Sequence, residues 1–170
     1  IYSGTSPEAD NWNMVGTFSI TKPIGKRCWT QLGGDLIIIT QRGYFPLSSV
    51  LSDLRANRAM LSQKIDGITQ GRDFTKRWEI HNRPSSNRII VNATTDTGIY
   101  NYEQHICNLN TNAWCRFVGM DANSWAVVGN NLYFCNGSGI WQADTGTTDN
   151  GSNIIFCIQK AYNNFGTPLK

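Results

Sequence analysis

A strand–glycine–strand unit that occurs three times is the feature of this sequence that most restricts its fold. Each copy opens with a short polar residue, runs apolar for about four residues, turns through polar residues to a glycine and ends on an apolar or aromatic pair. Glycine tolerates the positive φ that tight hairpin turns require, so each copy predicts an antiparallel β-hairpin. The copies are DLIIITQRGY (35–44), NRIIVNATTDTGIY (87–100) and NLYFCNGSGIW (131–141).

Segments that carry a tryptophan predict further strands between the hairpins. They are NMVGTFSI after Trp12, RWEIH around Trp78 and AWCRFVG around Trp114. A hairpin with one or two additional strands, recurring about every 40 residues, is the unit of a β-propeller blade. We therefore expect an all-β fold of propeller-like antiparallel blades, with about three repeats in a single domain over residues 1–170. Because the sequence starts with Ile1 and ends in NNFGTPLK, we expect it to be a fragment of a longer chain.

The spacing between the copies predicts one inserted helix near residues 49–66. The second copy begins 52 residues after the first, whereas the third begins 44 residues after the second. Ser48 or Ser49 can cap this helix, Asp53 lies in its first turn and Gly67 can end it. We expect its apolar side to pack on the sheet edge, and a docking helix for a neighbouring subunit is the alternative. The apolar residues at helical spacing are Leu47, Val50, Leu51, Leu54, Leu61 and Ile65.

Composition agrees with many short strands and weakens the case for a nucleic-acid-binding domain. The 18 Asn and 16 Gly favour turns, and six Trp and six Tyr favour strands. The net charge is only +3, whereas a dedicated nucleic-acid binder carries a dense basic stripe. The segment GRDFTKRW (71–78) could touch phosphate, but we expect a solvated connector, since no second basic cluster supports it. No apolar run is long enough to predict a membrane span.

The five cysteines are odd in number and contain no CxxC pair. Most lie in apolar or aromatic runs, where a free thiol behaves as a small hydrophobic group, so a reducing compartment is the simplest interpretation. A secreted protein with two disulfides and one spare thiol is the alternative. The cysteines are Cys28, Cys107, Cys115, Cys135 and Cys157.

The sequence offers little that predicts catalysis, a metal or a cofactor. His105 and Cys107 form an HxC pair, and His81 is the only other histidine. A zinc site needs four ligands, usually in clustered pairs, and Cys107 and Cys115 are eight residues apart. A Cys–His nucleophile built from His105 and one of the thiols stays an alternative, because such pairs assemble in space. We expect no catalytic, cofactor-binding or metal-binding residues.

Two patterns relate to carbohydrate chemistry. Thr94-Thr95-Asp96-Thr97-Gly98 resembles the Asp-box turn of sialidase-like propellers, in which the aspartate stabilises a turn and does not act on substrate. Aromatic side chains could form a sugar-binding platform, although we expect them to wedge between blades. These aromatic residues are Trp125, Tyr133, Trp141 and Tyr162.

The sequence also resembles a family of virion proteins from short-tailed phages and prophages. The resemblance begins with the series Trp12, Val15-Gly16, Pro23 and Gly25, and it spans nearly the whole chain. The later segments that carry it are LGGDLIIITQRGYFPLS, NTNAWCRF, SWAVVGNNLYF, GIWQADTGTTDNGSNI and AYNNFG. The family is the head-to-tail connector and tail-tube group of the packaged-DNA stabilisation type. Its members are much longer than this chain.

The resemblance implies a structural protein without catalytic residues. Subunits of this group are β-propeller-like and assemble into rings below the portal. We therefore expect a virion component that is assembled in the bacterial host cytoplasm, has portal and tail subunits as partners, forms a homo-oligomeric ring in the full-length protein and lies near DNA without reading its sequence. We expect no membrane partner. A carbohydrate-binding or adhesion propeller and a glycoside hydrolase fragment are the alternatives.

Overall fold

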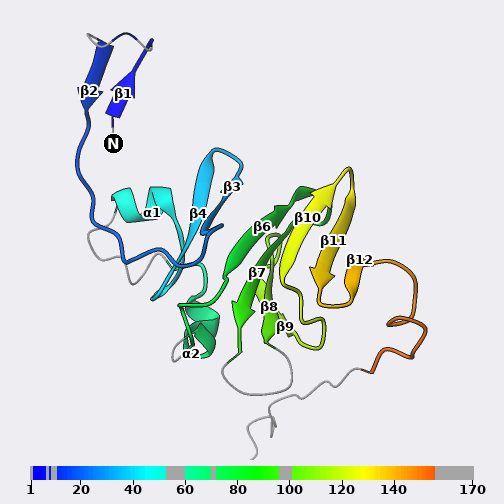
Figure 1. Cartoon of the computed structure of the whole chain (residues 1–170). Helices are drawn as coiled ribbons and strands as arrows, with labels where there is room; N and C mark the ends of the chain where they lie inside the picture. Colours follow the sequence, from blue (N-terminus) through cyan, green and yellow to red (C-terminus); the bar gives the residue numbers. More distant parts are fainter. Residues whose placement is uncertain are drawn as a thin grey trace, which may run out of the picture.

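The computed structural model describes residues 2–6, 8, 11–52, 60–69, 72–95 and 101–155, and it consists mainly of antiparallel strands (Figure 1). The all-β prediction is confirmed. The strands are β1 (Tyr2–Gly4), β2 (Trp12–Met14), β3 (Trp29–Leu32), β4 (Asp35–Thr40), β5 (Gly43–Pro46), β6 (Glu79–Arg83), β7 (Arg88–Thr94), β8 (Tyr102–Asn108), β9 (Ala113–Phe117), β10 (Ser124–Val128), β11 (Asn131–Asn136) and β12 (Gly139–Ala143). The helical segments are α1 (Leu47–Ser52), η3 (Gln63–Ile65), α2 (Asp66–Thr69) and η4 (Pro84–Ser86).

The strands form an N-terminal ribbon and three larger sheets. The ribbon is β1–β2, the first sheet is β3–β4–β5, the second is β6–β7–β8–β9 and the third is β10–β11–β12. Within each sheet the neighbouring strands are consecutive in the chain and antiparallel. The ribbon extends away from the three sheets (Figure 1).

Two of the three predicted hairpins are confirmed, as the β4–β5 and β11–β12 pairs, and β7 of the second copy pairs with β8, which begins just after that copy ends. Gly43 and Gly139 start the returning strands with φ of 137° and 149°, which is the backbone conformation for which glycine was expected there. The turn of the second hairpin, with Gly98, lies outside the described residues.

Two of the three tryptophan-bearing strands are also confirmed. RWEIH contributes β6, and AWCRFVG contributes β9. The strand predicted for NMVGTFSI is mostly wrong, because only Trp12–Met14 pairs with β1 and residues 15–20 are irregular. Val15, Phe18 and Ile20 remain exposed in that irregular segment.

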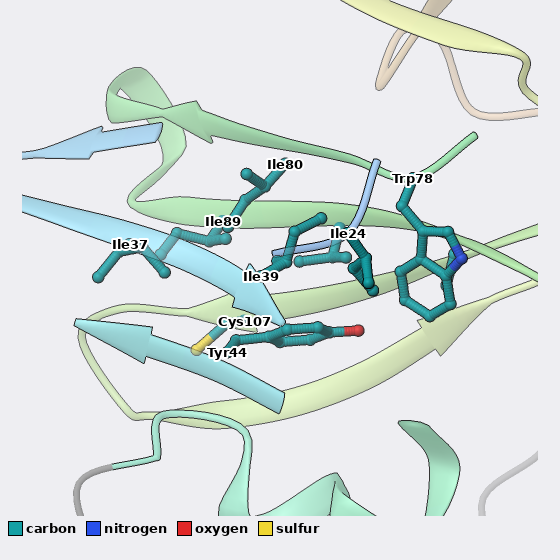
Figure 2. Packing of buried hydrophobic residues seen from close by; sticks show 10 residues of the cluster. Ile24, Ile37, Ile39, Tyr44, Trp78, Ile80, Ile89 and Cys107 are labelled. Carbon is teal, nitrogen blue, oxygen red and sulfur yellow. The ribbon is translucent and has the colours of Figure 1, made fainter. Parts of the chain in front are cut away.

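The second sheet lies between the first and the third, and both of its faces are buried. One face contributes Ile89, Val91 and Cys107 to a core shared with the first sheet (Figure 2). The other face contributes Ile90 and Ile106 to a core shared with the third sheet. Alternating residues of β7 therefore enter opposite cores, which explains why that strand is apolar almost throughout.

The first strands of the three sheets lie side by side, β3 beside β6 and β6 beside β10. Arg27, just before β3, connects all three sheets. Its carbonyl accepts a hydrogen bond from the Ile80 N–H, 3.0 Å away, and its Nη1 donates to the Trp125 carbonyl at 3.1 Å. Blades of a propeller meet along their first strands in this way. The described residues contain three sheets and no closed ring, so the propeller stays a prediction.

The buried side chain of Asn92 links the second sheet to the third through hydrogen bonds. The Asn92 amide donates to the Ala122 carbonyl at 2.8 Å. Its oxygen accepts from Gln104 Nε2 at 2.9 Å and from the Trp125 indole at 3.2 Å. A polar group in a core is tolerated when its hydrogen bonds are made, and these bonds fix the register of the two packed sheets.

The predicted helix over residues 49–66 is not one helix. Residues 47–52 form α1, residues 53–59 lie outside the described residues, and Met60–Ser62 are not helical. The Leu61 N–H donates to the Tyr44 carbonyl at 2.9 Å, and the Ser62 hydroxyl accepts from the Tyr44 N–H at 2.9 Å. These bonds hold Leu61 and Ser62 beside β5 in a turn, where the helix cannot continue. No helix in the described part of the chain is long and apolar enough to cross a membrane.

Gly25 places the segment before β3 directly against the second sheet, and we expect alanine there to be strongly destabilising. Its φ is +79°, and an added Cβ would lie 2.1 Å from the Trp78 carbonyl oxygen. A left-handed conformation alone costs an L-residue about 1–2 kcal/mol, and the clash adds to it. Urea unfolding of Gly25→Ala should therefore give a loss of more than about 3 kcal/mol.

Gly33→Ala is the matched control. Gly33 also has a positive φ, +59°, but an added Cβ would meet no atom within 4 Å. It should lose only the conformational part, about 1–2 kcal/mol. Equal losses in the two variants would contradict the close approach of Gly25 to Trp78.

Candidate functional site

Two Glu–x–His triplets form the centres of the two buried networks of ionisable side chains in the described chain. They are Glu79–His81 on β6 and Glu103–His105 on β8. Residues two apart on a strand share a face, so each histidine lies beside its own glutamate. The register pairs Glu79 with Asn92 and Glu103 with Ala93, so the two glutamates point to opposite faces of the second sheet.

The Glu103 network joins the first and second sheets. His105 Nε2 lies 2.9 Å from Glu103 Oε1, and because a carboxylate only accepts, Nε2 donates. The Tyr44 hydroxyl, from β5, lies 2.7 Å from His105 Nδ1. Arg72 Nη2 donates to Glu103 Oε1 at 2.7 Å, and its Nε donates to the Ile68 carbonyl of α2 at 3.0 Å. One chain of contacts thus connects β5, β8 and α2.

The Glu79 network lies on the other face, near the first strands. Glu79 Oε2 is 2.9 Å from His81 Nε2, and Oε1 is 2.8 Å from Arg77 Nε. Arg27 Nη1 is 3.8 Å from Oε2. The glutamate is fully buried, whereas both arginines are about half exposed, so the guanidinium groups cover the carboxylate from the solvent side.

Both carboxylates are held ionised by their neighbours. Burial raises the pKa of Glu103, but the hydrogen bond from His105 and the charges of Arg72, His105 and Arg116 outweigh burial, so its pKa lies below the ordinary 4.5. Burial likewise raises the pKa of Glu79, and His81, Arg77 and Arg27 together lower it below 4.5. Buried charges in this state are paired structural groups.

We expect the free energy of unfolding to fall with acid below pH 4.5. A depressed folded-state pKa contributes stability that is complete above the unfolded value and is lost as the pH falls through the folded value. Each proton taken up on unfolding gives a slope of up to about 1.4 kcal/mol per pH unit. Urea titrations between neutral and acid pH measure this slope.

The Glu103→Gln variant should give a flatter stability curve in the acid range, since one of the carboxyls whose pKa is depressed in the folded state is gone. Glu8→Gln is the matched control, because Glu8 is the third glutamate of the sequence and is exposed. It should keep the slope of the unchanged chain. A Glu103→Gln curve with the original slope would show that Glu103 is not the titrating group.

His105 and Cys107 do not form a nucleophile pair. Both ring nitrogens of His105 are engaged by Glu103 and Tyr44. Burial raises the pKa of the Cys107 thiol to about 11, so it stays protonated at neutral pH, and only the thiolate is a good nucleophile. Burial also raises the Tyr44 pKa well above 10, which keeps that phenol protonated. The network can hold the sheets together. The Tyr44 hydroxyl and the Cys107 thiol are buried and therefore closed to substrate.

The structure also answers the cysteine and metal questions for the described residues. Cys28, Cys107, Cys115 and Cys135 are all free thiols, so the alternative with two disulfides is wrong. Cys157 lies outside the described residues. Over the described ranges no three His, Cys, Asp or Glu side chains are placed to hold a metal ion.

The basic segment 71–78 is largely ion-paired. Arg72 contacts Glu103, Arg77 contacts Glu79, and Lys76 Nζ lies 3.9 Å from Asp73 Oδ2. Residues 72–78 do connect α2 to β6, as predicted. The connector is not fully solvated, however, because the Arg72 side chain is mostly buried. The charge of Arg72 therefore serves the fold.

The carbohydrate patterns do not converge on one surface. Trp125 is 3% exposed and wedges between the second and third sheets, as expected. Tyr133 and Trp141 occupy opposite faces of the third sheet, since Trp141 pairs with Phe134 and Tyr133 is its neighbour in the strand. Tyr162 and Asp96 of the Asp-box pattern lie outside the described residues. The two buried glutamates point apart and do not face each other across a cleft.

Sequence reasoning missed the groups that build these networks. Glu79, Glu103 and Arg72 were not singled out, and Tyr44 was noted only as part of a hairpin. The repeated Glu–x–His triplet was the available signal, because both copies lie in segments of strand-like sequence.

No family model, no curated protein and no solved structure matches this chain.

Proposed function

We propose that this chain is a structural component of a tailed-phage or prophage virion, in the head-to-tail connector or tail tube, and acts by subunit assembly around the DNA channel. The observation that carries the proposal is the stack of three antiparallel sheets, in which several polar groups join one sheet to the next. Asn92, Arg27 and the Glu103 network each span two or more elements. A stiff stack of this kind suits a part whose role is shape.

The sequence resemblance supplies the virion context. The net charge of +3 agrees with a wall that does not repel passing DNA. Portal and tail subunits would be its partners, in contacts of the polar, hydrated kind that uncharged Asn-rich surfaces favour.

Purified particles test the proposal. Virions are banded on a density gradient from an induced lysate of the source bacterium, and their proteins are identified by mass spectrometry. We expect the polypeptide that contains this sequence to co-purify with portal and tail proteins, with a cytosolic host protein as the control for carry-over. Recovery of the polypeptide only in the soluble fraction, or specific binding to a glycan array, would overturn the virion assignment.

A further inference from the structure

We infer that four cationic side chains form a contact patch for the phosphodiester backbone of nucleic acid, on the side where β3, β6 and β10 lie next to one another (Figure 1). This basic patch consists of Lys26 and Arg27, before β3, and Lys76 and Arg77, before β6. The inference rests on the proposed function, in which DNA passes beside the chain, and it names the residues that contact the DNA.

Two basic segments that are far apart in the sequence lie side by side in the fold. In the sequence, the basic segment 71–78 has no second basic cluster near it. The fold supplies one, because Arg27 forms a parallel bridge with Glu79, and its carbonyl accepts a hydrogen bond from the Ile80 N–H at 3.0 Å. Residues 26–27 therefore lie next to the start of β6, which residues 76–77 precede.

The two arginines of the basic patch are positioned by one buried carboxylate. Arg77 Nε lies 2.8 Å from Glu79 Oε1, and Arg27 Nη1 lies 3.8 Å from Oε2. Arg27 Nη1 also donates to the Trp125 carbonyl at 3.1 Å. The carboxylate is fully buried, whereas both guanidinium groups are about half exposed. Each arginine uses only one nitrogen for contacts with described residues, so its other nitrogens can donate to phosphate oxygens in solution.

The basic patch keeps a positive balance after its own ion pairs are counted. Glu79 is shared by the two arginines, so it cancels one of their two charges. Lys76 Nζ lies 3.9 Å from Asp73 Oδ2, while Lys26 is exposed and forms no ion pair with any described residue. With His81 neutral, the four cations and two carboxylates leave a balance of +2.

A polymer of phosphates suits the basic patch better than a single small anion. The cations are spread over two chain segments, and the regularly repeated charges of a nucleic-acid strand can meet several of them at once. Contacts of lysine and arginine with phosphates carry no direct sequence information, so we expect binding without sequence preference. The DNA that passes through the channel in the proposed function supplies this ligand.

Binding of a labelled DNA duplex tests the inference. The 170-residue chain is titrated into a fluorescein-labelled duplex of about 20 base pairs, and fluorescence anisotropy is measured from about 20 to about 200 mM salt. Lys26→Gln removes one charge of the basic patch. Asp73→Asn removes an acidic neighbour, and its amide oxygen can still accept the hydrogen bonds from the Thr75 N–H and hydroxyl.

Lys64→Gln is the matched control, because it changes the net charge by the same amount as Lys26→Gln. Lys64 is exposed and donates to the Asn112 carbonyl, in the turn between β8 and β9. The antiparallel register of β6, β7 and β8 places that turn at the opposite end of the second sheet from the start of β6. Circular dichroism checks that each variant is folded.

We expect the unchanged chain and Lys64→Gln to bind the duplex equally at low salt. The logarithm of the binding constant should fall against the logarithm of salt concentration with a slope between about −2 and −3, as for roughly two or three phosphate contacts. Lys26→Gln should weaken binding about threefold or more and flatten the slope by about 1. Asp73→Asn should tighten binding by a similar factor, which is a gain that misfolding does not produce.

Equal weakening by Lys26→Gln and Lys64→Gln would show that only net charge matters and would overturn the inference, as would the absence of binding at the lowest salt. Poly-glutamate that displaces the labelled duplex as well as unlabelled duplex does, at equal charge, would assign the basic patch to an acidic protein and overturn it too. A labelled single strand of the same sequence is also titrated. Binding to either polymer supports the inference, and the tighter of the two identifies the source of the phosphates.

The inference and the proposed function fail separately. A chain that does not bind nucleic acid overturns the basic patch, whereas the particle experiment alone decides the virion assignment. Conversely, the expected binding by a polypeptide that is absent from virions would leave the nucleic-acid contact standing and remove its proposed setting.

Discussion

Replacing Trp78 with alanine should reduce the free energy of unfolding by about 3–5 kcal/mol, the range for large aromatic side chains removed from a core. Trp78 is fully buried at the junction of the first and second sheets, in contact distance of Phe74, with a ring-centroid separation of 5.6 Å. Its indole N–H also donates to the Asp73 carbonyl at 3.0 Å, so the truncation leaves a cavity and removes one of the two hydrogen bonds to that carbonyl, the other coming from the Thr94 hydroxyl. Urea denaturation followed by fluorescence measures the loss.

Trp12→Ala removes the same side chain from the N-terminal ribbon, where it is 49% exposed. This variant should lose less than about 1 kcal/mol, as is usual for exposed positions away from the core. A Trp78→Ala protein as stable as Trp12→Ala would refute the sheet junction described for the first two sheets.

Replacing Glu103 with alanine should cost about 3–5 kcal/mol, because it removes one partner of a buried ion pair and leaves the other charge uncompensated. Arg72, which is mostly buried, would lose its carboxylate, and His105 would lose the acceptor of its Nε2–H. Glu8→Ala, at an exposed glutamate, should be nearly neutral.

A double-mutant cycle with Arg72→Ala separates the pair from the rest of the network. If the 2.7 Å contact dominates, the double variant should be less destabilised than the sum of the two single variants by about 0.5–3 kcal/mol. Strict additivity would mean that Arg72 and Glu103 act independently and would contradict the network.

The sequence was most informative where the deciding interactions are local. The β4–β5 and β11–β12 hairpins depend on alternating apolar residues and on Gly43 and Gly139, all within about ten residues of each other. The strands around Trp78 and Trp114 have the same local character. The irregular residues 15–20 read as a strand for the same reason, but they have no neighbouring strand in the described structure to pair with.

The sequence was least informative where distant backbone groups compete. The apolar spacing from Leu47 to Ile65 is helical, yet the hydrogen bonds of Leu61 and Ser62 with Tyr44 hold that part of the chain beside β5. Likewise, the Glu103 network takes Tyr44, Arg72 and His105 from three separate segments, and no spacing rule brings them together. The basic patch became visible only once the segment before β3 was found to lie beside β6.

During translation the first sheet leaves the ribosome long before its interior can be completed. Its own hairpin can close early, because β3, β4 and β5 are consecutive. Ile37 and Ile39, however, are covered by Trp78 and by residues as late as Cys107. The apolar side of the nascent first sheet therefore stays exposed to solvent until more than half of the chain has been synthesised. We expect this sheet to be the segment to which a chaperone binds during folding.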